Sequence, residues 1–225
     1  MNPFEDLLNQ MIAAMLPQIN GAIQQSIKNS HLDPWGQVAS GNERIGSIDI
    51  FICDASVGAN YNVVDMRGLS GITINSIVLS KTQTDPQDPD KLTGSINVTA
   101  AMSQNLSARL SGNVEAKCGP VHPSIGLGGS TTVSGLVASA GGFFSARVDN
   151  DKVCLDSISM SNMDVNYSDL SVHVDSLGIF SFLLDPLVNV IVNCFKGQIT
   201  QAIGNALKPE INNQVNSILP LCQKL

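Results

Sequence analysis

The last third of the chain carries apolar residues at steps of three, four or one, which is the spacing of one face of an α-helix. The pattern predicts a long helix over residues 181–219. Asp185-Pro186 near its start supplies a capping carboxylate, followed by a residue that is pre-bent for the first helical turn. The apolar positions of this helix are Leu184, Leu187, Val188, Ile191, Val192, Phe195, Ile199, Ala202, Ile203, Ala206, Ile211, Val215, Ile218 and Leu219.

A second helical stripe lies at the N-terminus and predicts a helix over residues 1–30. Pro17 falls inside this stripe and is expected to bend the helix or divide it in two. The apolar positions of this stripe are Leu8, Met11, Ile12, Met15, Ile19, Ile23 and Ile27.

Between the two helices the period changes to two, which predicts an antiparallel sheet over residues 44–176. The segment from Asp85 to Asp90 contains two prolines and predicts a turn between two strands. Gly141-Gly142 predicts a bulge or bend in a strongly curved strand. The resulting order is a helix, six to eight strands and a long helix, which is an α+β fold that we expect to form a single domain over residues 1–225.

A long helix with a mostly β partner must lie along or inside a curved sheet. We therefore predict a curved antiparallel sheet rolled around the C-terminal helix, a geometry that can enclose an elongated apolar tunnel. The sequence leaves open whether side chains or a guest molecule fill it.

Composition narrows the classes of partner. Charged residues make up 14% of the chain and apolar residues 43%, so neutral polar groups must cover much of the surface. Lys and Arg total 12 and form no run, and the net charge is −7, which argues against binding to nucleic acid. The acidic balance also disfavours simple adsorption to anionic membranes.

The segment from Leu177 to Phe195 approaches the length of a bilayer span and carries a single charge. Asp185, Asn189 and Asn193 lie inside it, and a carboxylate in the middle of a span is costly. We therefore expect a buried amphipathic helix here and no membrane span.

Motifs of catalysis or cofactor binding are missing from the sequence. Gly68 to Gly71 fails the nucleophile-elbow pattern, and Gly126 to Gly129 lacks the final glycine and the following helix of a dinucleotide fingerprint. The three histidines lie far apart in the sequence, at His31, His122 and His173. We therefore expect a binding protein that is not an enzyme and has no cofactor.

Asp85, Asp88 and Asp90 could chelate calcium, but the prolines between them and the missing Gly/Glu pattern favour a solvated loop. The five cysteines form no C-x-x-C pair and no cluster with histidine. No metal site is predicted.

Five cysteines allow fifteen ways of forming two disulfides with one cysteine left over. Cys154 lies in the last predicted strand and Cys194 on the long helix, so a bridge between them would tie sheet to helix. The alternative is that Cys194 is a small buried thiol.

Evidence for secretion in the sequence is indirect. N-x-S/T acceptors for glycosylation occur at Asn97, Asn105 and Asn166, although a chain rich in Asn and Ser produces such matches by chance. The N-terminus is acidic and carries no apolar leader, which fits a mature secreted chain and also a cytosolic protein.

Several short motifs resemble the group-seven house-dust-mite allergens. These motifs are Arg44–Asp49, Asp65–Leu69, Leu184–Leu187, the break Leu32-Asp33-Pro34 and the late Leu207-Lys208-Pro209. The resemblance covers nearly the whole chain in the same order. That group is related to the tubular lipid-binding superfamily, which includes bactericidal/permeability-increasing, takeout and juvenile-hormone-binding proteins.

The resemblance implies a highly curved antiparallel sheet rolled around a long C-terminal helix, in a secreted protein that holds a hydrophobic or lipid-like ligand. A Cys154–Cys194 link resembles the strand-to-helix disulfide of the bactericidal branch. The chain departs from the mite proteins in its low surface charge and its cysteines, and it has no basic tip like that of the lipopolysaccharide-binding branch.

Two functions follow as expectations. The first is carriage of an apolar ligand, such as a lipid, terpenoid, sterol or pigment, between helix and sheet in an extracellular setting. The second is surface activity or host defence at an interface or on bacterial lipids. Apolar residues at such positions are more often plain core than ligand lining. The candidate lining residues are Met11, Met15, Ile19, Ile191, Phe195, Ile199 and Ile203.

Overall fold

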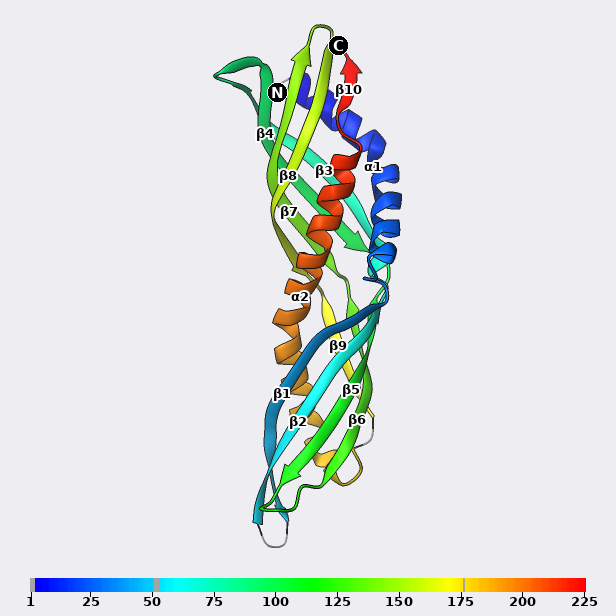
Figure 1. Cartoon of the computed structure of the whole chain (residues 1–225), viewed down its shortest axis with the longest axis vertical. Coiled ribbons are helices and arrows are strands. Elements are labelled where there is room, and N and C mark those ends of the chain that lie inside the picture. The colour runs from blue at the N-terminus through cyan, green and yellow to red at the C-terminus, as the bar shows by residue number, and fades with distance from the viewer. Residues whose placement is uncertain (1–2, 51–52, 176) are drawn as a thin grey trace.

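Two long helices and two curled antiparallel sheets build an elongated rod (Figure 1). The computed structural model describes residues 3–50, 53–175 and 177–225. The helices are α1 (Pro3–Asn29) and α2 (Leu184–Ser217), and a 3-10 segment, η2 (Gly178–Leu183), leads directly into α2. None of the described helices contains an apolar stretch long enough to cross a membrane.

Sheet A forms the lower half of the rod in Figure 1, with the strand order β1-β2-β5-β6-β9. All neighbouring strands of this sheet run antiparallel. Its strands are β1 (Trp35–Ile50), β2 (Cys53–Arg67), β5 (Leu106–Lys117), β6 (Ser124–Ser134) and β9 (Asp169–Val174).

Sheet B forms the upper half, with the strand order β10-β8-β7-β4-β3, and its neighbouring strands are also antiparallel. A short 3-10 turn, η1 (Leu69–Gly71), connects sheet A to sheet B between β2 and β3. The strands of sheet B are β3 (Ile72–Asp85), β4 (Asp88–Met102), β7 (Val137–Asp149), β8 (Lys152–Asn166) and β10 (Leu221–Lys224).

Each sheet turns one face toward the helices, because alternate side chains of a strand point to the same side. On β2 the inward residues Val57, Ala59, Tyr61 and Val63 are all at most 1% exposed. The α2 helix follows both halves of the rod and contacts β1 and β9 of sheet A and β8 of sheet B. The α1 helix packs against β3, η1, β8 and α2, so it belongs to the sheet-B half.

The predicted α+β class is confirmed, with curled antiparallel sheets, an N-terminal helix and a long C-terminal helix. The strands divide into two sheets, begin already at Trp35 and include β10 after α2, none of which the sequence indicated. Alternation is the same in both sheets, so the pattern of residues does not mark where one sheet ends and the next begins.

Local signals correspond to real features of the backbone. The α1 helix continues through Pro17, and Figure 1 shows that it bends along its length. β3 ends at Asp85 and β4 begins at Asp88, at the predicted turn. The register of β7 against β8 shifts between Gly141 and Gly142, which is the predicted bulge.

Candidate functional site

The free edge of β3 is covered by amide side chains from α1. Asn9 accepts a hydrogen bond from the Leu79 N–H (2.8 Å) and donates one to the Leu79 carbonyl (2.9 Å). Asn20 makes the same pair of bonds with Ile74, at 2.7 and 3.1 Å. Each amide therefore takes the place that a residue of a neighbouring strand would occupy.

The spacing of these asparagines fits the strand that they cover. Asn9 and Asn20 lie about 16 Å apart along the helix, at about 1.5 Å per residue. Leu79 and Ile74 lie about 16 Å apart along β3, at about 3.3 Å per residue. A helix antiparallel to the strand can thus bond its backbone at both points without distortion.

The α2 helix closes the other side of sheet B in the same way, beyond the short stretch where β10 pairs with β8. Asn216 accepts from the Ile158 N–H (3.1 Å) and donates to the Ile158 carbonyl (2.7 Å). Asn212 accepts from the Met160 N–H (3.3 Å), and Lys208 donates to the carbonyl of Ser161.

Sheet A lacks this kind of closure among the described residues. Its edge strands β1 and β9 both contact α2. Among the described residues, Gln198 Nε2 of α2 donates a hydrogen bond to the Ser40 carbonyl of β1, at 3.5 Å. Among the described residues of α2, the apolar side chains of Leu187, Ile191 and Ile199 are buried on this side of the helix.

Most of the predicted lining residues lie in the interior, in one continuous apolar cluster. Met15 is half-buried and packs against this cluster. The side chain of Phe195 lies outside the described part of the structure. The buried members are Met11, Ile19, Ile191, Ile199 and Ile203. Burial fits both a ligand-lining and a core role, so their part in binding stays a prediction.

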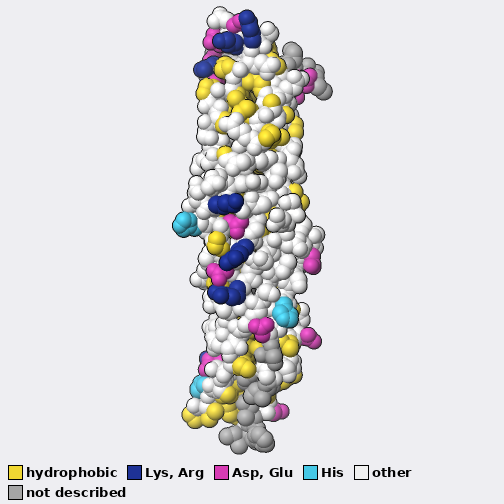
Figure 2. Space-filling view, turned by 90° about the vertical axis from the view of Figure 1, so that its right-hand side faces the viewer, with side chains coloured by type: hydrophobic (Ala, Val, Ile, Leu, Met, Phe, Trp, Pro, Cys, Tyr) yellow, Lys and Arg dark blue, Asp and Glu magenta, His cyan; other side chains and the backbone are white. Residues whose placement is uncertain are grey.

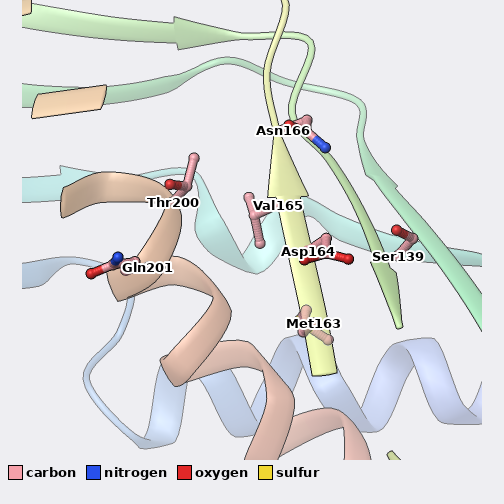
Figure 3. A pocket seen from close by; sticks show the side chains of 7 residues that line it. All are labelled: Ser139, Met163, Asp164, Val165, Asn166, Thr200 and Gln201. Carbon is pink, nitrogen blue, oxygen red and sulfur yellow. The ribbon is translucent and has the colours of Figure 1, made fainter. Parts of the chain in front are cut away.

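A hollow of about 390 Å³ lies between α2 and the end of β8, where α2 passes from one sheet to the other (Figure 3). Its wall is mixed, because Met163 and Val165 stand beside hydroxyl, amide and carboxylate groups. None of the predicted lining residues borders it. Its lining is Ser139, Met163, Asp164, Val165, Asn166, Thr200 and Gln201.

The predicted disulfide is wrong. Cys154 is bonded to Cys222, and Cys53 is bonded to Cys118. Cys222 stands directly opposite Cys154, because β10 folds back onto β8 after α2 ends. Cys154 is therefore not available to Cys194, whose side chain lies outside the described part of the structure. The actual bridge anchors the chain that follows the helix.

The predicted glycosylation sites Asn97, Asn105 and Asn166 are all exposed, and glycosylation itself stays a prediction. Within the described residues no group of three or more His, Cys, Asp or Glu side chains could hold a metal ion. Figure 2 shows a face of the rod with few charged side chains, on which Lys and Arg gather near mid-length and at one end while Asp and Glu are scattered.

The sequence analysis did not identify the asparagines that close sheet B. Asn is a poor residue for the interior of a helix because its side chain competes for backbone hydrogen bonds. Asn9, Asn20, Asn212 and Asn216 all lie within helices, and that conflict with helix propensity was the available signal.

No family model and no curated protein matches the chain. The chain is similar to a crystal structure of lipopolysaccharide binding protein, with a TM-score of 0.45, 14% identity, and coverage of 94% of this chain and 39% of that one. It is also similar to Takeout 1 from Epiphyas postvittana, with a TM-score of 0.33, 10% identity, and coverage of 95% and 92%. The chain thus spans 39% of the length of the first of these proteins.

Proposed function

We propose that the protein binds and carries an apolar, lipid-like ligand in the half of the rod formed by sheet A and the first half of α2. The observation that carries this proposal is the unequal closure of the two halves. Amide side chains hold both helices to sheet B, whereas the described pairs join α2 to the edges of sheet A by one side-chain hydrogen bond, from Gln198 to Ser40.

The ligand would enter where α2 separates from β1 or β9. Among the described pairs, separation there breaks the Gln198–Ser40 hydrogen bond, and it exposes apolar side chains that a hydrocarbon chain can cover again. Leu187, Ile191 and Ile199 of α2 would contact the ligand, with Ala59 and Val57 of β2 on the opposite wall, all at most 1% exposed. Burial of each methylene contributes about 0.8 kcal/mol before ordering costs.

An extracellular setting belongs to the same proposal. Two disulfides close long loops in the chain, with sequence separations of 65 and 68. Bridges of this kind persist in oxidising compartments and are rare in the cytosol. The exposed acceptors Asn97, Asn105 and Asn166 are consistent with passage through a secretory route.

Organic extraction of protein from its natural source, followed by mass spectrometry, tests the proposal directly. A fluorescent fatty-acid probe tests it on recombinant protein. Protein that carries no extractable lipid and takes up no probe would contradict the carrier function.

A matched pair of variants locates the ligand. Ala59 on β2 and Ala146 on β7 are both 0% exposed and face the interior of sheet A and sheet B respectively. Ala59→Leu is expected to weaken probe binding at least ~10-fold by filling the ligand space, while Ala146→Leu leaves it unchanged. Both variants add the same side-chain volume at a buried position, and urea unfolding measures the stability cost of each, which is roughly 1–3 kcal/mol in a well-packed core. Equal effects on probe binding would contradict the assignment to sheet A.

Surface activity is a second candidate function, favoured by exposed apolar groups near the free end of sheet A. Phe182 on η2 is 54% exposed and Val121 in the β5–β6 connection is 56% exposed. Figure 2 shows hydrophobic side chains gathered at both ends of the rod. A surface-active protein lowers surface tension at micromolar concentration, whereas a carrier leaves it nearly unchanged. Phe182→Ser is expected to weaken the lowering of surface tension and to leave binding of the fatty-acid probe unchanged.

A further inference from the structure

Two of the four arginines of this acidic chain meet on the outer face of sheet A. Arg67 stands near the end of β2 and Arg109 on the adjacent strand β5, beside an open hollow of about 290 Å³. The complete lining of this hollow is Asp65, Arg67, Ser107, Ala108, Arg109, Gly129 and Ser130.

A bulge in β2 brings the two arginines to the same face. Val64 pairs with Arg109 and Arg67 pairs with Ser107, so β2 contains one more residue than β5 in this interval. Asp65 takes a left-handed conformation there (φ 54°), and Met66 becomes the buried residue (1% exposed). Without the extra residue, alternation would turn Asp65 inward and Met66 outward.

The strands next to the bulge add hydroxyl groups. Ser107 lies opposite Arg67, and Ser130 of β6 lies opposite Arg109. Both serines are exposed on the same outer face as the arginines. The hollow thus combines two guanidinium groups with two hydroxyl donors, which is the donor set that binds phosphate oxygens.

The charges of this cluster do not cancel. Arg109 forms an ion pair with Asp65, with 2.8 Å between Nη2 and Oδ2. Within the described residues Arg67 forms no ion pair. Asp65 therefore holds one guanidinium in place and leaves the cluster with a net charge of +1, in a chain whose net charge is −7.

We propose that this hollow binds a phosphate group, with Arg67 and Arg109 as charged ligands and Ser107 and Ser130 as hydroxyl donors. The phosphate could belong to a soluble phosphate ester or to the headgroup of a lipid, since both present the same oxygens. The site lies on the outer face of the sheet, and the inference is independent of the apolar ligand proposed above.

The experiment measures binding of inorganic phosphate to the full chain by calorimetry or by NMR of the arginine Nε–H groups. Arg67→Gln is expected to weaken binding at least ~10-fold, the effect of losing a charge-assisted contact. Arg147→Gln is the control, because it removes the same charge from an exposed arginine on the outer face of sheet B, where Arg147 is paired with Asp156 (3.6 Å). It should bind phosphate like the unaltered protein.

A second variant is expected to bind phosphate more tightly than the unaltered protein. Asp65→Asn removes the competing carboxylate, and asparagine tolerates the left-handed backbone at this position. It should therefore bind phosphate several-fold more tightly, while circular dichroism confirms an unchanged fold. Equal binding by the Arg67→Gln and Arg147→Gln variants, or no gain in Asp65→Asn, would overturn the proposal.

Two further arms identify the source of the phosphate. Phosphatidylcholine vesicles with phosphatidic acid should retain the protein, and Arg67→Gln should release it, if the site reads a lipid headgroup. Binding of inorganic phosphate without retention on these vesicles assigns the site to soluble phosphate esters. Retention on phosphatidylcholine alone, unaffected by Arg67→Gln, counts against a phosphate site.

Discussion

In the half of the rod built on sheet B, two helices cover the sides of the sheet and bond its backbone, whereas one helix serves the half built on sheet A. Asn20 and Asn216 each satisfy both polar groups of a strand residue. Gln198 reaches the edge of sheet A at 3.5 Å. The comparison teaches that the described side chains of α2 bond strand backbone at three residues of its C-terminal half, Lys208, Asn212 and Asn216, and at Gln198 in its N-terminal half.

The largest expected loss of stability comes from removing the Cys154–Cys222 disulfide, which holds the chain after the end of α2. Cys154→Ser combined with Cys222→Ser opens a loop with a sequence separation of 68 and should lower the free energy of unfolding by roughly 4 kcal/mol. Urea denaturation followed by circular dichroism measures this loss. Hydrogen exchange should also accelerate in the last turns of α2.

The second disulfide is the control for that experiment. Cys53→Ser combined with Cys118→Ser opens a loop of nearly equal separation, 65, and should cost about as much stability. It lies in sheet A and leaves the C-terminal end of α2 anchored. Acceleration of exchange there in both double variants would refute a local anchoring role for Cys154–Cys222.

Removing single amide side chains compares how strongly each half of the rod is closed. Asn20→Ala leaves the N–H and the carbonyl of Ile74 without their side-chain partner, and should cost roughly 2–3 kcal/mol. Gln198→Ala removes a long, exposed contact and should change stability by less than about 0.5 kcal/mol. Comparable losses in the two variants, measured in urea, would mean that the halves are closed equally well.

The bulge in β7 offers a comparison between two adjacent residues of sheet B. A Cβ on Gly142 would lie 2.1 Å from the Ser159 carbonyl oxygen, whereas a Cβ on Gly141 would meet nothing within 4 Å. Gly142→Ala should therefore destabilise the protein by about 2 kcal/mol. Gly141→Ala should leave stability nearly unchanged. Thermal unfolding of both variants measures the difference, and equal midpoints would contradict this account.

The smallest change in stability is expected for a substitution of Asp33, at the junction between the two halves of the rod. Asp33 accepts hydrogen bonds from the Gly68 and Ser70 N–H groups at 3.0 and 2.8 Å. Burial raises the pKa of Asp33, but these bonds and that from the Ser70 hydroxyl outweigh it and leave the pKa below its usual value. Asp33→Asn should cost about 1 kcal/mol at neutral pH.

The pH dependence of this contribution has a definite sign. Because the pKa is lower in the folded state, the stabilisation is complete above the unfolded value of about 3.9 and is lost as pH falls through the folded pKa. The difference in unfolding free energy between the unaltered protein and Asp33→Asn should therefore shrink in acid. A difference that grows in acid would contradict this account.

The sequence predicted what depends on local periodicity and missed what depends on distant partners. The stripe through Ile191, Ile203 and Val215 predicted α2 because the positions of one helix face recur within a few residues. The partner of Cys154 lay in a strand of four residues after α2, too short to show alternation. The role of Asn20 depended on a backbone 54 residues away, which no local pattern encodes.

The candidate site was predictable to the same degree. Burial of Met11, Ile19 and Ile199 followed from their positions on apolar stripes. The difference in closure between the two halves could not be predicted from the sequence, because it depends on which polar side chains lie against which strand edges. The arginine hollow was equally hidden, since a one-residue bulge decides that Arg67 and Arg109 share a face.

The amides of α1 also bear on how the protein behaves at high concentration. An uncovered edge strand is a template on which other chains can add strands and aggregate. Asn9 and Asn20 occupy donors and acceptors of β3 that such an incoming strand would need. Loss of α1, by truncation or proteolysis, would therefore uncover this edge and favour intermolecular β-pairing.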